Sequence, residues 1–276
     1  IIFNYKNRNF LIDCGEGTQR QIRKAKLNIC KITDILITHM HGDHIFGLPG
    51  LLHTLSKSGY NRELMIYCPK GAGKKMKQFL DLTGVHGIDY KIKEVRGKFI
   101  DNPYFSISSL ALDHDVTCNG YMFEEKDRLR IDKKKLSKYN IKGKEIGKLI
   151  RKKNVKIDGK LIKYKNITFL EKGRKISFVF DTKYCSNVDK LIKNSDVAVM
   201  EGVFLGNTSI GKKMSKKYKH LTLEESARAG KKGKVKELII SHISQRYEFK
   251  EKFLLKEAKK IYKNVRIAND LMKVTI

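Results

Sequence analysis

The chain has 276 residues, enough for one large domain or two modest ones, and its 41% hydrophobic content is typical of a globular protein with a substantial core. No stretch approaches the roughly 18 consecutive apolar residues of a membrane-spanning helix, which argues against a membrane protein. The net charge of +30 indicates a polyanionic partner such as nucleic acid, although a lysine-rich proteome or a thermophile's charged surface would give the same composition.

The first half of the chain alternates short apolar stretches, typical of strands, with helical ones. Strands are predicted at residues 1–5 and 9–13 (a hairpin), 34–38, 64–68, and 89–95 paired with 105–112. One helix is predicted to end near residue 26, another to span 72–82, and a third to span 45–58 with an early interruption at Gly47, Pro49 and Gly50. The chain opens inside a strand and without methionine, so we expect an N-terminal strand and loop to be missing from it.

Residues 126–166 form a basic segment, with 17 Lys or Arg against 4 acidic residues and no long helical apolar stripe. We expect an exposed arm inserted between sheet segments and refer to it as the basic arm. The alternative is a disordered charged loop.

Regular structure resumes after the basic arm. Strands are predicted at 175–180, 196–200 and 237–241, helices at 223–231 and around 250–259, and a final hairpin joins 265–268 to 271–275. We find no internal repeat and no interdomain linker. The sequence therefore predicts one α/β domain over residues 1–276, built from two mixed sheets covered by helices.

The five cysteines are widely spread and form no C-x-x-C pair. An odd number in this arrangement indicates reduced, mostly buried thiols rather than a disulfide framework. We therefore expect a cytoplasmic protein.

The loop at residues 39–44 reads His-Met-His-Gly-Asp-His and directly follows the predicted strand 34–38. Three imidazoles and a carboxylate in six positions are costly unless a cation neutralises them. His and Asp suit zinc or another borderline divalent metal, and two adjacent ligand sets suit two metals. A polar loop with incidental histidines is the less favoured interpretation.

Three more candidate ligands follow apolar strands: His114, Asp181 and His242. Taken singly each is weak, because a His after a strand is more often a hydrogen-bonded structural residue. Taken together, strands that present ligands at one edge indicate a complete metal centre.

The order of these motifs resembles the ribonuclease Z family of the metallo-β-lactamase superfamily. The resemblance covers nearly the whole chain and is carried by the stretches 11–21 (LIDCGEGTQRQ) and 39–50 (HMHGDHIFGLPG), then by His114 with Gly120-Tyr121, Asp181-Thr182, Glu201, His220-Leu221-Thr222 and His242. It implies an αββα sandwich, with the dinuclear site at one edge and the basic arm as an insertion.

The resemblance also implies a ligand set for two zinc ions per subunit. His39, His41 and His114 would hold one ion, Asp43, His44 and His242 the other, and Asp181 would bridge them. Asp43 would also accept the proton of the attacking water. Glu201 and His220 would act as a carboxylate–imidazole acid on the departing ribose 3′-oxygen. Independently of the resemblance, Thr222 and Glu225 predict a capping box that sets His220 just before a helix, although a capped helix start with a chance histidine would look the same.

The implied reaction is the endonucleolytic removal of the 3′ trailer from precursor tRNA after the discriminator nucleotide, which leaves a 3′-hydroxyl. The basic arm would grip the tRNA far from the scissile bond, and the family's dimers use one subunit's arm on substrate bound to the other. Three departures from the family pattern stand out: Phe180 before Asp181, Met200 before Glu201, and the absence of proline from 142–148 in the arm.

Two other functions compete with this interpretation. Another hydrolase of the same fold, such as a thioesterase, lactonase or arylsulfatase-like enzyme, would share the metal loop but would not need the +30 charge or the basic arm. A non-enzymatic RNA-binding protein with a structural metal site would not need Glu201 and His220, because structural zinc sites close at four ligands.

Overall fold

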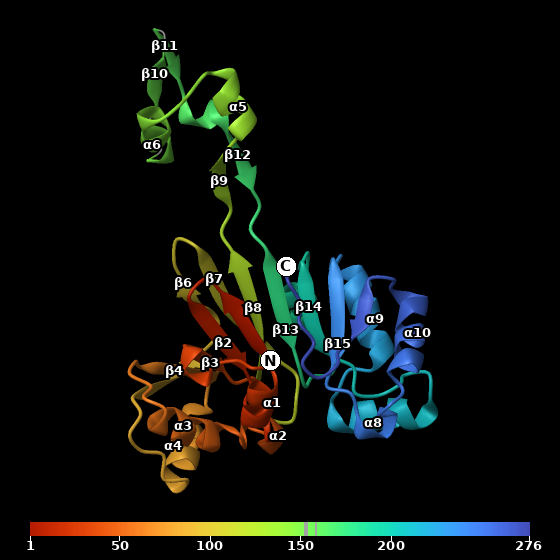
Figure 1. The fold of residues 1–276 in the computed structure, drawn as a ribbon. Helices are drawn as coiled ribbons and strands as arrows, with labels where there is room; N and C mark the ends of the chain where they lie inside the picture. Colours follow the sequence, from red (N-terminus) through yellow and green to blue (C-terminus); the bar gives the residue numbers. More distant parts are fainter. Residues whose placement is uncertain (152–153, 158) are drawn as a thin grey trace.

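Two β-sheets pack face to face with helices on both outer faces (Figure 1). The structure, a computed structural model, describes residues 1–151, 154–157 and 159–276. The layering confirms the predicted αββα sandwich. No helix in these described ranges is long and apolar enough to cross a membrane.

The first sheet has five strands in the order β1-β2-β3-β4-β5. The β1 and β2 strands form the predicted hairpin, and the remaining neighbours run parallel. The strand bounds are β1 Ile2–Tyr5, β2 Arg8–Ile12, β3 Asp34–Leu36, β4 Leu64–Pro69 and β5 Tyr90–Val95. The helices beside this sheet are α1 Thr18–Lys24, η1 Ile29–Lys31, α2 Gly42–Ile45, α3 Leu48–Lys57 and α4 Gly73–Leu82.

The second sheet has seven strands in the order β16-β15-β14-β13-β8-β7-β6. Its strands are β6 Gly97–Asp101, β7 Phe105–Leu112, β8 Cys118–Glu125, β13 Lys175–Val179, β14 Val197–Glu201, β15 Glu237–Ser241 and β16 Val265–Ile267. The helices that follow its strands are α7 Ser186–Ile192, α8 Ser209–Tyr218, α9 Leu223–Lys232, η3 Gln245–Tyr247 and α10 Glu251–Ile261.

The strand directions of the second sheet determine where the site forms. Because β7 and β13 are both antiparallel to β8, they run parallel to each other and to β14 and β15. The carboxyl ends of all four strands therefore meet at one edge. This edge receives every candidate residue that was predicted to follow a strand of this sheet.

Three hydrophobic clusters hold the sandwich together. The cluster between the sheets is rich in aromatic residues, including Phe10, Tyr121, Phe123 and Phe178, because strands of both sheets alternate large side chains toward it. The other two clusters lie between each sheet and its covering helices. Apolar burial on both faces of each sheet accounts for the near-continuous apolar runs in β3, β4 and β14.

The basic arm projects from the end of the sandwich opposite α2 and α8 (Figure 1). It leaves through the antiparallel ribbon of β9 and β12 and has a small core of its own, formed by Ile141, Leu149, Val155, Ile162 and Ile167. Its elements are β9 Arg128–Ile131, α5 Lys133–Lys138, α6 Lys144–Ile150, β10 Val155–Ile157, β11 Lys160–Ile162, η2 Tyr164–Ile167 and β12 Thr168–Glu171.

The structure corrects several local predictions. The strands predicted at 89–95 and 105–112 are not partners: β5 pairs with β4, whereas β7 pairs with β6 and β8 in the other sheet. Residues 271–275 form no strand, and β16 instead pairs in parallel with β15. These two errors share a cause, since strand pairing depends on contacts that local patterns do not contain. The early interruption predicted for the helix at 45–58 is confirmed, because α2 ends at Ile45 and α3 begins at Leu48.

Candidate metal centre

The loop after β3 is held in place by the glycine-rich turn after β2. The backbone N–H of Cys14 donates to the carbonyl of His44 at 2.8 Å, and the N–H of Gly47 donates to the carbonyl of Cys14 at 2.9 Å. The approach is so close that a Cβ on Gly15 would lie 1.9 Å from the carbonyl oxygen of Asp43. Only glycine fits there, so the turn and the metal loop form one rigid unit.

Asp13 is the side chain that orients this loop. Its carboxylate accepts hydrogen bonds from the backbone N–H of Thr38 at 2.7 Å and from the Thr38 hydroxyl at 2.8 Å. The second carboxylate oxygen also lies 2.8 Å from Nδ1 of His44. A carboxylate on the far nitrogen of an imidazole is the usual support for a metal-ligating histidine, because it fixes the ring and leaves Nε2 free.

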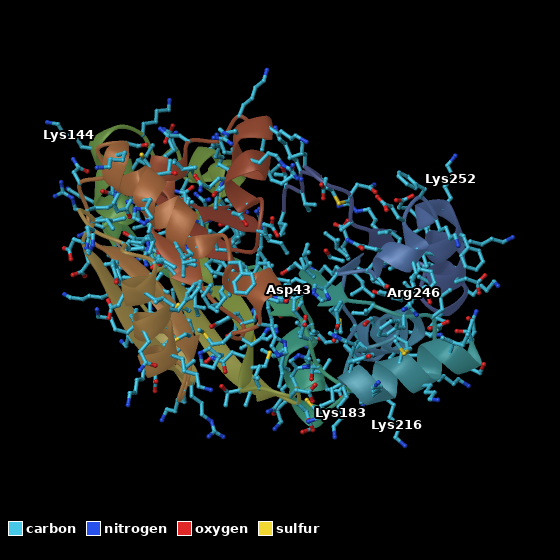
Figure 2. All side chains as sticks on the ribbon, turned by 90° about the horizontal axis from the view of Figure 1, so that it is seen from below. Asp43, Lys144, Lys183, Lys216, Arg246 and Lys252 are labelled. Carbon is cyan, nitrogen blue, oxygen red and sulfur yellow. The ribbon has the colours of Figure 1, made fainter. Side chains whose placement is uncertain are left out.

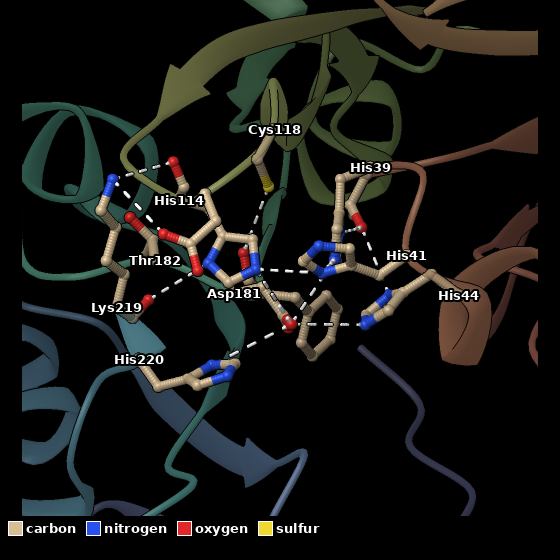
Figure 3. Close-up of polar contacts among 12 residues, drawn as sticks. His39, His41, His44, His114, Cys118, Asp181, Thr182, Lys219 and His220 are labelled. Carbon is tan, nitrogen blue, oxygen red and sulfur yellow. Dashed lines mark hydrogen bonds and ion pairs between the residues drawn. The ribbon is translucent and has the colours of Figure 1, made fainter. Parts of the chain in front are cut away.

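The predicted ligands gather around the Asp181 carboxylate. Figure 3 shows four of the histidines, His39, His41, His44 and His114, beside it. One group of ligand atoms within 4.8 Å of one another comes from His39, His41, His114 and Asp181; a second comes from Asp43, His44, Asp181 and His242. Asp181 is common to both. The two groups are the same two sets that the sequence resemblance implies.

Three buried polar atoms in this cluster make no hydrogen bond with any other described residue: Nε2 of His44, Oδ1 of Asp181 and Nδ1 of His242. Burying polar atoms without partners is costly. Imidazole nitrogens and a carboxylate oxygen are the donor atoms that zinc and similar divalent metals take. The residues therefore fit a metal centre.

The charges at the site respond strongly to burial and to one another. Burial lowers the pKa of His39 to about 2, so this imidazole stays neutral, the form that binds metal. Burial would also lower the pKa of His44, but the nearby carboxylates of Asp13, Asp181 and Asp43 outweigh it and raise that pKa to about 12. Burial opposes ionisation of Asp181 as well, yet His44 and the other nearby imidazoles hold its pKa below the usual range. The buried carboxylate of Asp181 is therefore stable only beside positive charge, which either protonated imidazoles or a bound cation can supply.

Glu201 and His220 form a buried pair beside the ligand cluster. Nδ1 of His220 lies 2.7 Å from Oε2 of Glu201 and 4.0 Å from Oδ2 of Asp181. The other Glu201 oxygen accepts from the backbone N–H groups of Thr182 at 2.7 Å and Leu221 at 3.0 Å. Burial raises the pKa of Glu201. The pKa of His220 is also raised, because its bond to Glu201 outweighs the opposing effect of burial.

The start of α9 fixes the direction of His220. Thr222 caps this helix, with the Glu225 N–H donating to the Thr222 hydroxyl at 3.2 Å and the Thr222 N–H donating to the Glu225 carboxylate at 2.8 Å. This is the predicted capping box, and it is confirmed. Because His220 precedes the cap by two residues, its ring is placed by a well-defined helix start.

The two departures at strand ends leave the site intact. Met200 is fully buried in the outer cluster against α9, so no polar group faces the site from this position. Phe180 packs into the aromatic cluster between the sheets, and Asp181 after it adopts a positive φ of 46°. The Phe180 ring lies beside that of His242, with ring centroids 6.4 Å apart, and so forms an apolar wall next to the candidate ligands.

The sequence did not indicate the residues that support the candidate ligands through hydrogen bonds. Asp13 and Thr38 support the metal loop, and the hydroxyl of Thr182 accepts from the N–H of Asp113 at 3.0 Å next to His114. Lys219 donates to the carbonyl of His114 at 3.2 Å. For Asp13 the signal was present, since it stands inside the stretch 11–21. Thr182 also stands in a motif of the resemblance, Asp181-Thr182, whereas Thr38 and Lys219 have no distinctive sequence pattern.

The layering and the position of this cluster are those of metallo-β-lactamase fold proteins. Among solved structures, the human tRNase Z, short form, matches 100% of this chain and 91% of its own with a TM-score of 0.67 and 24% identity. The zinc-bound PqqB of Methylobacterium extorquens matches 100% of this chain and 86% of its own with a TM-score of 0.66 and 11% identity. At sequence identities this low, these two structures show only that they share the fold of this chain.

Sequence comparison identifies the family. The ribonuclease Z of Listeria monocytogenes serotype 4b is 40% identical over 283 aligned residues, which cover 98% of this chain and 90% of the relative. The chain belongs to the ribonuclease Z family. Residues 1–138 also match the family model described as anti-Pycsar protein Apyc1, a region that includes the metal loop and His114 but stops before Asp181, Glu201, His220 and His242.

Proposed function

We propose that this chain is a zinc-dependent endoribonuclease that cleaves precursor tRNA after the discriminator nucleotide and leaves a tRNA 3′-hydroxyl. The observation that carries the proposal is the Glu201–His220 pair beside the ligand cluster. A structural metal site needs no such pair, whereas release of a ribose 3′-oxygen requires a proton donor. Membership of the ribonuclease Z family supports tRNA as the substrate.

The proposed centre holds two zinc ions per subunit. His39, His41 and His114 would bind one, Asp43, His44 and His242 the other, and Asp181 both. Zinc in such a centre lowers the pKa of water and stabilises negative charge on a phosphoryl group. The unpartnered atoms of His44 and Asp181 support this assignment.

The protein's own residues would move the protons. Asp43 is the most exposed carboxylate of the cluster, and its side chain is accessible to a water molecule that approaches the phosphate. It would accept the proton of the attacking water. His220, held by Glu201, would donate a proton to the departing 3′-oxygen. The raised pKa of His220 keeps this imidazole protonated nearer to neutral pH, as the role requires.

The competing hydrolase activities make the proposal testable. Zinc-loaded protein at nanomolar concentration should cleave precursor tRNA while leaving thioester, lactone and sulfate-ester substrates essentially unchanged. Faster turnover of one of those substrates than of precursor tRNA would assign the site to that chemistry. Failure to cut any phosphodiester would favour the RNA-binding alternative.

We further propose that the protein acts in the cytoplasm as a homodimer and that the basic arm binds tRNA away from the scissile bond. The arm's separate core and its position far from the metal centre support a role in substrate binding rather than in catalysis (Figure 1). Lysine and arginine contacts to phosphates position a nucleic acid without reading its sequence.

A further inference from the structure

Helix α8 presents a lysine-rich surface with no acidic residue. Its sequence is SIGKKMSKKY, in which Gly211 and Ser215 are buried and the lysines exposed to solvent are Lys212, Lys213, Lys216 and Lys217. In the part of the chain that the structure describes, none of these four lysines forms an ion pair, whereas the neighbouring Lys183 and Lys219 both pair with Asp113.

This composition is unusual even in so basic a protein. Among the helices with three or more lysines, α4 and α10 also contain Asp or Glu, and only α8 and the arm helix α5 contain none. The arm helix lies at the opposite end of the molecule (Figure 1). The face that carries Asp43 is shown in Figure 2, where Lys216 extends from α8 into solvent. A second unneutralised basic surface therefore lies apart from the arm.

The end of α8 is fixed to His220. The N–H of His220 donates to the carbonyl of Ser215 at 3.0 Å, and the hydroxyl of Ser215 donates to the carbonyl of His220 at 2.5 Å. Lys219 closes the helix in a left-handed conformation, with φ of 51°. Any RNA that binds along α8 would therefore lie at a fixed distance and direction from His220, the proposed proton donor.

The direction of the cleavage reaction determines which part of the RNA lies along α8. In phosphoryl transfer the attacking and leaving oxygens lie roughly in line on opposite sides of phosphorus. His220 protonates the leaving 3′-oxygen, so it stands on the side of the nucleotide that keeps this oxygen. That nucleotide ends the tRNA body, while the trailer departs with the phosphate.

We propose that α8 binds backbone phosphates of the tRNA acceptor end, on the 3′-hydroxyl side of the cut, and not those of the trailer. Lys212 and Lys216 lie four residues apart on one helix face, as do Lys213 and Lys217. A helix of ten residues is about 15 Å long, which spans several phosphates of one strand. This inference rests on the proposed function, and it identifies α8 as the element that binds the acceptor end of the tRNA beside the metal centre.

The test is the double variant Lys212→Gln/Lys216→Gln. Loss of two phosphate contacts should raise KM for precursor tRNA about tenfold, leave kcat within about twofold, and lower the slope of log KM against log salt by about 2. The matched control is Lys259→Gln/Lys263→Gln, two exposed lysines near the end of α10. They precede β16, which runs parallel to β15, so they lie at the sheet edge opposite His242. The control should change KM by less than twofold.

Two further substrates identify the RNA segment. The increase in KM should be the same for a one-nucleotide trailer as for a long one, and mature tRNA without any trailer should inhibit the α8 variant about tenfold less strongly than wild type. An increase that disappears with the one-nucleotide trailer would assign α8 to the trailer and overturn the proposal. So would an α8 variant that behaves like its control. Loss of the proposed function itself would be evident separately, as wild-type protein that cleaves no precursor tRNA.

Discussion

At the scale of single residues, Asp181 is the centre of the candidate site. Its two oxygens lie 3.4–3.9 Å from imidazole nitrogens of His39, His44, His114 and His242. Its side chain is 3% exposed, so water cannot satisfy the carboxylate. Because Asp181 belongs to both ligand groups, its removal should weaken the binding of both proposed metal ions.

Asp181→Ala should therefore lose metal and activity together. We expect the zinc content to fall from about two per subunit to one or none, because both proposed sites lose a ligand. Elemental analysis after extensive dialysis provides the measurement. Asp115→Ala, which removes an exposed carboxylate near His114, is the control and should keep both ions. Full zinc content in Asp181→Ala would refute the bridging assignment.

His220→Ala should separate catalysis from metal binding. Its zinc content should match wild type, while kcat on precursor tRNA falls by about 10²–10⁴, the usual contribution of a general acid. His86→Ala changes an exposed histidine outside the cluster and should leave both quantities unaltered. Wild-type kcat in His220→Ala would exclude this residue as the proton donor, and loss of zinc would make it a ligand instead.

At the scale of elements, the contact between the turn after β2 and helix α2 determines the shape of the metal loop. Gly15 and Gly47 both stand where a Cβ would meet backbone: Gly15 against the carbonyl of Asp43, and Gly47 against the carbonyl of Gly15 at 2.0 Å. Backbone cannot move aside as a flexible side chain can. The geometry of the loop thus depends on the contact between two segments whose glycines, Gly15 and Gly47, stand 32 positions apart in the sequence.

Gly15→Ala should weaken metal binding without touching a ligand. Displacement of the Asp43 carbonyl would misplace Asp43 and His44, and we expect a loss of about 10- to 100-fold in zinc affinity, as for the removal of supporting contacts in other metal sites. Competition with a chromogenic chelator measures this loss. Gly71→Ala, at an exposed turn where no atom lies within 4 Å of the added Cβ, is a control for general glycine effects. Equal zinc affinities for the two variants would contradict this account of the loop.

The elements also show what the sequence could predict. The candidate ligands in 39–44 and the residues after β7, β13 and β15 were predictable, because apolar runs followed by His or Asp are local patterns. The partners of β5 and the parallel pairing of β16 were not, since they depend on contacts between distant segments. Helix α8 was not predicted because its buried residues are only Gly211 and Ser215, so the sequence shows no apolar stripe of helical period there. Asp13 had a visible motif, but its role requires the folded contact with His44.

At the scale of the whole molecule, the basic arm and the candidate metal centre are spatially separate (Figure 1). The basic arm has its own core and joins the sandwich through one two-stranded ribbon. The return strand β12 extends to Glu171, beyond the predicted boundary of 166. Because Leu129 and Leu170 are register partners, the arm can be excised between them.

Replacing residues 130–169 by Asn-Gly should close the ribbon as a hairpin and leave the sandwich folded. We expect KM for precursor tRNA to rise by about 10² or more, because many phosphate contacts are lost, while hydrolysis of bis(p-nitrophenyl) phosphate stays near wild type. Steady-state kinetics on both substrates measures the effect. Equal loss of both activities would mean that the arm supports the fold.

If the dimer uses its arms in trans, two inactive variants should complement each other. An arm-excised subunit retains its metal centre, and a His220→Ala subunit retains its arm. An equal mixture that exchanges subunits should recover about a quarter of wild-type activity, since half of the dimers then hold one working site. No recovery in a mixture shown to contain heterodimers would exclude arm action between subunits.

The position of the cut in the RNA, and the fragment that keeps the phosphate, follow directly from the role proposed for His220. Zinc-loaded protein should convert precursor tRNA into a tRNA that ends at the discriminator nucleotide with a 3′-hydroxyl, together with a trailer that carries a 5′-phosphate. Mapping both product ends tests this result. A tRNA fragment with a 3′-phosphate or a cyclic phosphate, or a cut elsewhere in the chain, would contradict the assignment of His220 to the leaving 3′-oxygen and the proposed function with it.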